Sequence, residues 1–139
     1  MTQPTLTAIR NGLAAYLASK ITGLRATGNR PLQVNPPQAV IMPTQGAFAR
    51  YSVTLDGEAD YSLRIILLVA PADSTMGEDL LDPYIATSGP QSIWAAVQAD
   101  PTLGGLVSYA AVIEATGYGL MNMTGIDYLA VHFIINIGV

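Results

Sequence analysis

The clearest pattern in the chain is an alternation of apolar and mixed positions that runs from Ile126 to the last residue. Every odd position from 129 onward is apolar, namely Leu129, Val131, Phe133, Ile135, Ile137 and Val139. A second alternation covers residues 61–70, where one face holds Tyr61, Leu63, Ile65, Leu67 and Val69. Successive side chains of a strand point to opposite faces, so both patterns predict strands with one buried face. Their other faces are only half polar.

Three weaker patterns predict further strands. One covers residues 38–43, and another lies within residues 50–55, just before the hairpin signal Asp56-Gly57. A third covers residues 106–115, with an expected buried face of Val107, Tyr109, Ala111 and Ile113. Glycines at 117, 119 and 125 follow it, and they predict a long turn over residues 117–125.

Apolar residues at spacings of three and four predict two helices. The first covers residues 5–21, with Thr5 as its N-cap. The second follows Thr75, which with Glu78 fits a capping box, and Pro83 is expected to kink or restart it. Its expected buried side consists of Leu80, Leu81, Tyr84 and Ile85.

A third helix is predicted within the stretch SGPQSIWAAVQADPTLGG, residues 88–105. Ser88 and Gln91 fit a capping box at its start. Asp100-Pro101 ends it, because the residue before a proline is pushed out of the α region. The expected buried face is Ile93, Trp94 and Val97.

The order of these elements groups strands and helices instead of alternating them. Such grouping predicts an α+β fold, with a mainly antiparallel sheet of four to five strands and two to three helices packed on one face. A length of 139 residues fits a single domain over residues 1–139.

Charged residues are scarce in this chain. This scarcity changes how the half-apolar face of the sheet is interpreted. Only 12% of the residues are charged, against about 25% in typical domains, and half are apolar. The longest apolar run, residues 65–70, is too short to span a membrane, and the N-terminus does not resemble a signal peptide. We therefore expect the half-apolar sheet face to be buried by assembly, the alternative being an unusually apolar monomer. Some of the arginines are then candidates to pair with acidic groups of a neighbouring subunit.

Candidate chemistry is sparse. The only histidine, His132, lacks an orienting carboxylate, because Asp127 lies on the other face of the same predicted strand. The acidic triplet Asp56, Glu58 and Asp60 lacks the glycine and the closing glutamate of a calcium loop. There is no cysteine, and the net charge of −4 does not suit a nucleic-acid surface. We expect no enzyme, no cofactor, no metal site, no membrane partner and no sequence-specific binding of nucleic acid.

Four segments together carry a resemblance to a known family. They are LTAIRNGLAAYLASKITGLR, VNPPQAVIMP, SGPQSIWAAVQADPTLGG and GIDYLAVHFIINIGV. In this combination the chain resembles the small tail terminator proteins of long-tailed bacteriophages, especially those of actinobacterial hosts. The third segment is the most specific, and the resemblance spans nearly the whole chain.

The resemblance implies a structural role in the neck of the virion, after assembly in the host cytoplasm. Tail terminators are α+β subunits that form a ring, in this case expected to be a hexamer, on the last ring of the tail tube. The ring stops tube polymerisation and offers a docking surface to the head connector or stopper protein. The expected partners are therefore further copies of the chain, the tail tube protein and the connector, with DNA passing through the ring.

For the contact surfaces of such a ring, the candidates come from the second sheet face and two long loops. They are Arg50, Arg64, Ile66, Tyr118, Met121, Tyr128, His132 and Ile134. Three alternatives stay open: another neck component such as a head-tail stopper, an enzyme with an acidic site near Asp79, Asp82 and His132, and a ligand-binding module whose pocket is lined by the half-apolar face.

Overall fold

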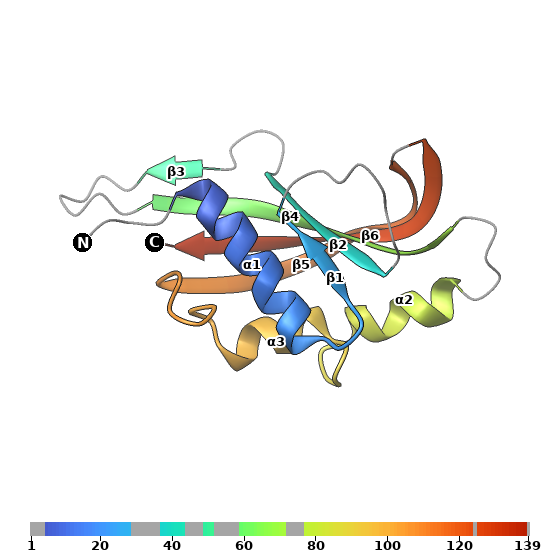
Figure 1. The fold of residues 1–139 in the computed structure, drawn as a ribbon, viewed down its shortest axis with the longest axis horizontal. Helices are drawn as coiled ribbons and strands as arrows, with labels where there is room; N and C mark the ends of the chain where they lie inside the picture. Colours follow the sequence, from blue (N-terminus) through green and yellow to red (C-terminus); the bar gives the residue numbers. More distant parts are fainter. Residues whose placement is uncertain are drawn as a thin grey trace.

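A computed structural model of the chain describes residues 5–28, 37–43, 49–51, 59–71, 77–123 and 125–138. These residues form helices and strands whose arrangement is shown in Figure 1. In chain order the elements are α1 (Leu6–Lys20), β1 (Arg25–Thr27), β2 (Gln38–Pro43), β3 (Ala49–Tyr51), β4 (Ala59–Pro71), α2 (Gly77–Ile85), α3 (Ile93–Ala99), β5 (Tyr109–Met123) and β6 (Ile126–Gly138). Two predicted features, Thr75 and the turn Asp56-Gly57, lie outside the described residues.

The described strands form one sheet in the order β1-β2-β4-β6-β5, and the short β3 pairs with β4 beside β2. The β1–β2 pair is parallel, and the other four pairs are antiparallel. The two strands with the strongest apolar alternation, β4 and β6, pair with each other in the interior of the sheet. The predicted α+β class with a mainly antiparallel sheet is confirmed.

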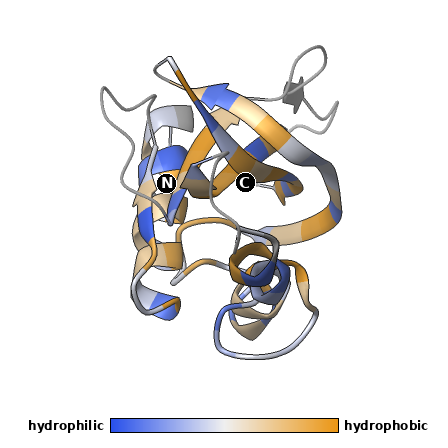
Figure 2. Ribbon diagram, turned by 90° about the vertical axis from the view of Figure 1, so that its right-hand side faces the viewer, coloured by the Kyte–Doolittle hydropathy of each residue, from blue (hydrophilic) through white to orange (hydrophobic). Residues whose placement is uncertain are grey.

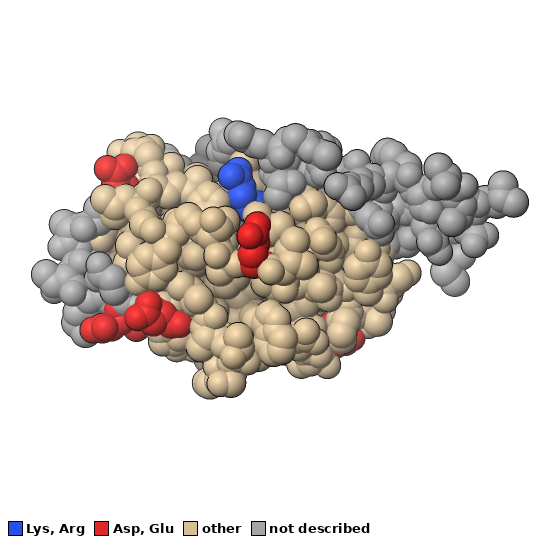
Figure 3. Space-filling model, turned by 180° about the vertical axis from the view of Figure 1, so that it is seen from behind, with Lys and Arg blue, Asp and Glu red and all other residues tan. Residues whose placement is uncertain are grey.

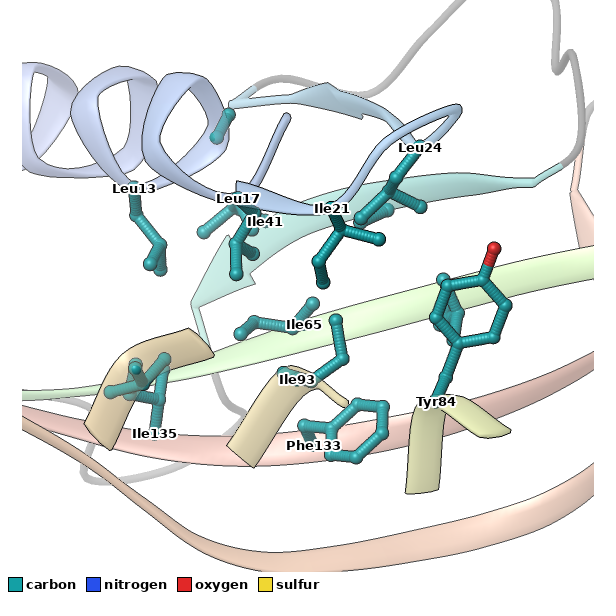
Figure 4. Close-up of a cluster of buried hydrophobic side chains, with 14 of the residues drawn as sticks. Leu13, Leu17, Ile21, Leu24, Ile41, Ile65, Tyr84, Ile93, Phe133 and Ile135 are labelled. Carbon is teal, nitrogen blue, oxygen red and sulfur yellow. The ribbon is translucent and has the colours of Figure 1, made fainter. Parts of the chain in front are cut away.

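The three described helices cover one face of this sheet. Helix α1 contacts β1 and β2, α2 contacts β4 and β6, and α3 contacts β5. Between the layers lies the main core, in which aliphatic side chains from both layers meet (Figure 4). Burying a large aliphatic side chain contributes about 1.5–3 kcal/mol. The odd positions of β6 from Val131 to Ile137 point into this core, as their alternation predicts.

Helix α1 begins and ends as its sequence predicts. The Thr5 hydroxyl accepts a hydrogen bond from the Ala8 amide at 3.1 Å, so Thr5 is the N-cap. The helix stops at Lys20, and Gly23 takes a positive φ of 84° in the turn that follows. Near the end of α1, Tyr16 donates a hydrogen bond of 2.7 Å to the Ala96 carbonyl, which ties α1 to α3.

Helix α3 starts four residues later than predicted. Its N-cap is Ser92, whose hydroxyl accepts from the Ala95 amide at 3.0 Å and donates to the Ala86 carbonyl. Ser88 is not the cap, because Gly89 takes a positive φ of 102° and turns the chain before a helix can begin. The predicted end at Asp100 is confirmed.

Strand β5 is much longer than predicted. The expected turn over residues 117–125 is wrong, because the strand continues to Met123 and turns into β6 around Gly125. Register shifts at Val112/Glu114 and Thr116/Gly119 interrupt its pairing with β6. Gly117 sits at the second shift with a φ of 69°, a conformation that favours glycine. Gly117 therefore marks a bulge inside β5 and does not end the strand.

Several expected core residues are exposed. Tyr109 and Ile113 in β5 point out, and Ala110 and Val112 lie inward, because they pair with Ile137 and Ile135 of the core face. Ile113 is the extra residue at the first register shift. On the helices, Leu80 is 47% exposed and Trp94 is 37% exposed, so neither belongs to the buried faces predicted for α2 and α3.

Candidate subunit interface

At one end of the sheet, the half-apolar second face is largely buried within the subunit itself. A separate apolar cluster forms there from Val40, Ile66, Leu68, Met123, Tyr128 and Ala130. It joins β2 and β4 to the far end of the β5–β6 hairpin, where the sheet bends strongly (Figures 1 and 2). Ile66 is fully buried and Tyr128 nearly so. Their assignment to an intersubunit surface is therefore wrong, because the fold itself covers them.

The other end of this face is half-buried. Arg64 and Ile134 are cross-strand partners in β4 and β6, and His132 is the cross-strand partner of Ile66. Burial lowers the pKa of His132, and the positive charge of Arg64 lowers it further, so the ring is neutral at neutral pH. The Nε atom of Arg64 is buried without a hydrogen-bond partner among the described residues. These three predicted residues lie together, and their side chains are partly accessible.

Three other residues of the predicted contact surface lie apart from Arg64, His132 and Ile134. Arg50 lies in β3, and its side chain is outside the described residues. Met121 is half-buried against the second cluster. Tyr118 is exposed in β5 and donates a hydrogen bond of 3.0 Å to Asp82 of α2. The predicted set therefore does not form one continuous surface.

Uncharged groups dominate the side of the molecule that faces away from α1. In Figure 3 most of its described surface is neither acidic nor basic, with separate acidic groups and little basic surface. Such a surface has little of the charge that keeps monomers apart. This agrees with the low overall charge of the chain.

Most of the large apolar side chains that are exposed among the described residues lie in β5. This strand ends the described sheet, so only its β6 side is paired there. Tyr109, Ile113, Tyr118 and Leu120 are exposed along it, with Ile113 at 56% and Leu120 at 65%. An exposed, long, apolar edge strand presents unpaired backbone groups to another chain. We call the outer side of residues 109–123 the β5 edge.

Beside the β5 edge lies a groove between β5 and the helices. It encloses about 170 Å³ and is lined mainly by apolar side chains: Ile85, Thr87, Trp94, Val112, Ile113, Glu114, Ala115 and Phe133. We call it the β5–α3 groove. Trp94 and Ile113 are exposed at it, so this groove and the β5 edge form one apolar surface, and Glu114 is the carboxylate among the lining residues.

Little in the described residues resembles a catalytic or ligand site. A second hollow beside α2 encloses about 110 Å³, and Asp79, Leu80 and Tyr84 are among its lining residues. Both hollows are smaller than the roughly 300–1,000 Å³ usual for small-molecule sites. Within the described ranges, no three His, Asp or Glu residues come together as metal ligands. The same residues include no helix long and apolar enough to cross a membrane.

Sequence reasoning missed the residues that matter most at this surface, namely Trp94, Tyr109, Ile113, Glu114 and Leu120. Hydrophobicity alone assigned three of them to the core. Leu120 was assigned to a turn because of the glycines beside it. A signal was present in the length of the pattern, since apolar residues continue through Leu120, Met121 and Met123.

No protein-family model matches this chain, and no curated protein matches it.

Proposed function

We propose that the chain is a tail terminator, a structural subunit that forms a ring on the head-proximal end of a phage tail tube. The ring ends tube polymerisation and provides the docking surface for the head connector. The observation that carries the assembly part is the β5 edge, where exposed apolar side chains follow a long strand at the end of the described sheet. The assignment to a tail rests on the four resembling sequence segments.

Other features support the same function. The α+β fold matches what the resemblance implies, and the helix pair α2–α3 stands before the last two strands, an order that favours a terminator over a stopper. Among the described residues, no group of three or more His, Asp or Glu side chains could hold a metal ion. The described residues thus offer a surface for protein contacts along β5.

The mechanism follows from the geometry of a closed ring. Identical subunits that join head to tail close into a ring when the rotation between neighbours divides a full turn evenly. A ring with tube-like contacts on one side only can bind the last tube ring. Its other side lacks the surface that the next tube ring would need. Polymerisation then ends at the cap.

The location of the protein can be tested on tails. A tagged chain is added to purified headless tails that lack it, and the tag is located by gold labelling in negative-stain images. We expect label at one end of each tail only. Label along the tube, or no binding to tails at any protein concentration, contradicts the proposal.

A further inference from the structure

The pairing of β5 with β6 shifts between Thr116 and Gly119, where two residues of β5 stand opposite the single residue Val131. These two residues are Gly117 and Tyr118, and we call them the β5 bulge. An extra residue in one strand bends that strand and changes where its side chains point. The β5 bulge belongs to the exposed β5 edge, so its conformation helps to decide how that edge is presented.

The β5 bulge covers part of the ring of His132, the only histidine of the chain. A methyl group added at Gly117 would lie 3.2 Å from Cδ2 and 3.7 Å from Nε2 of this ring. The bare backbone of Gly117 therefore packs against the imidazole, on the sheet face away from the helices. Its φ of 69° also favours glycine. Space and backbone conformation thus both require glycine at this position.

The other residue of the β5 bulge is tied to a helix. Tyr118 donates a hydrogen bond of 3.0 Å from its hydroxyl to the Asp82 carboxylate of α2. Helix α2 itself packs on β4 and β6, so this bond joins the helix to the edge strand. Water competes for an exposed hydrogen bond, so the bond contributes little net free energy. Two adjacent residues therefore link His132 on one face of the sheet to α2 on the other.

Two charged side chains lie near His132 on the same face of the described sheet. Arg64 of β4 and Glu114 of β5 pair with Ile134 from its two sides, and Ile134 is the next residue of β6 on this face. Burial, and after it the positive charge of Arg64, lowers the pKa of His132, so the covered ring is neutral at neutral pH. A proton on the ring would be repelled by Arg64 and attracted by Glu114. The charged ring would also need water, which the covering backbone of Gly117 keeps away.

We propose that His132 and the β5 bulge form an acid-sensitive latch. In the closed latch the neutral ring is covered by Gly117, and Tyr118 holds Asp82. When the ring takes up a proton, the β5 bulge lifts, water reaches the charged imidazole, and Tyr118 releases α2. The latch is a property of one subunit, so it does not depend on the proposed function.

Two features make the bulge the part that moves. His132 stands in β6, which is paired on both sides by β4 and β5, whereas β5 lies at the end of the described sheet. Glycine also changes its backbone angles at little cost, so Gly117 can serve as the hinge. The contact of the ring with β4, where Ile66 is its cross-strand partner, is expected to stay in place.

Proton NMR over a pH series tests the latch, because the resonances of the single histidine ring report its protonation directly. At neutral pH a nuclear Overhauser cross-peak should connect an α proton of Gly117 to Hδ2 of His132, since the glycine lies against Cδ2. Below the pKa of His132 this cross-peak should be lost, and a cross-peak between the ring and Ile66 should remain. A Gly117 cross-peak that keeps its intensity on the protonated ring overturns the latch. Loss of the Ile66 cross-peak also overturns it, because the ring has then moved instead of the bulge.

The link to α2 is tested by Tyr118→Phe, which removes the bond to Asp82. A latch that opens more easily lets His132 take up its proton more readily, so the pKa of His132 should rise by up to about one pH unit. Tyr109→Phe makes the same change elsewhere in β5 and should leave this pKa unchanged. Equal pKa values for His132 in the wild type and in Tyr118→Phe would show that the bulge does not couple the ring to α2, and would overturn the proposal.

Discussion

Single side chains fix both ends of α3. Ser92 forms the N-cap and also bonds the Ala86 carbonyl of the preceding turn. Past the helix, both oxygens of the Asp100 carboxylate accept hydrogen bonds, from Thr102 and from the Gly104 amide. These bonds, the Thr102 hydroxyl first, lower the pKa of Asp100. The helix that borders the β5–α3 groove is therefore held at both termini by local polar contacts.

Replacing Ser92 tests the cap. Ser92→Ala should lower the free energy of unfolding by about 1–2 kcal/mol, because the Ala95 amide and the Ala86 carbonyl both lose their partner. Ser88→Ala, at the cap position that the sequence suggested, is the matched control and should leave stability unchanged. Urea unfolding measures both. An equal loss in the two variants would contradict the assignment of Ser92 as the cap.

His132 should make folding sensitive to mild acid. Its pKa in the folded chain is lowered from 6.5, first by burial and then by Arg64. Below pH 6.5 the unfolded chain therefore binds a proton that the folded chain resists, and stability falls as the pH drops. The effect reaches its limit once the pH passes the folded-state pKa, and it is absent above about pH 7.

The variant His132→Gln removes this titration. Compared with the wild type, its stability should depend less on pH below 6.5, while the difference between the two chains stays constant at higher pH. Thermal melts over a pH series provide the measurement. Parallel pH profiles for the two chains would show that His132 titrates normally in the fold.

At the scale of elements, a helix or strand was predicted more accurately where its apolar pattern in the sequence was stronger. Helix α1, β2, β4 and β6 agree closely with their sequence patterns, because each combines regular apolar spacing with a clear start or stop. Strand β5 departs from its pattern in two ways. Its glycines serve bulges within the strand, and its register shifts move the inward positions to Ala110 and Val112. Register depends on the partner strand, which local sequence does not reveal.

The candidate surface was harder to predict than the fold. The half-apolar face of β4 and β6 did predict a second buried region, yet much of it is closed by the β5–β6 hairpin of the same chain. Which apolar side chains remain exposed depends on where the sheet ends. That β5 lies at the end of the described sheet follows from strand order, a property of the whole fold.

The β5 edge can be tested with two exposed leucines. Leu120→Lys places a charge on the edge and should weaken self-association at least about tenfold, since its side chain is expected to be covered by the neighbour. Leu80→Lys on α2 is the matched control, because Leu80 is similarly exposed away from β5. It should leave self-association unchanged. Equal effects of the two substitutions would show that the β5 edge has no special role.

At the scale of the whole molecule, the chain combines a self-contained core with a surface that is poor in charge. Side chains from α1, α2 and α3 meet those of the sheet within one subunit to form that core. The exposed apolar side chains of the described residues lie mostly on one strand, β5, at the end of the described sheet. A subunit with one exposed apolar edge is suited to the proposed ring, in which every copy meets its neighbour in the same way.

The length of tails made without this protein tests the central claim most directly. Under the proposed function a tailed phage encodes the chain. Its coding sequence would be removed from that phage, and tails in the lysate would be imaged by negative stain, with the chain supplied from a plasmid as the control. The account predicts overlong tails without heads, and normal tails joined to heads when the chain is restored. Tails of normal length attached to heads in the absence of the chain would contradict it.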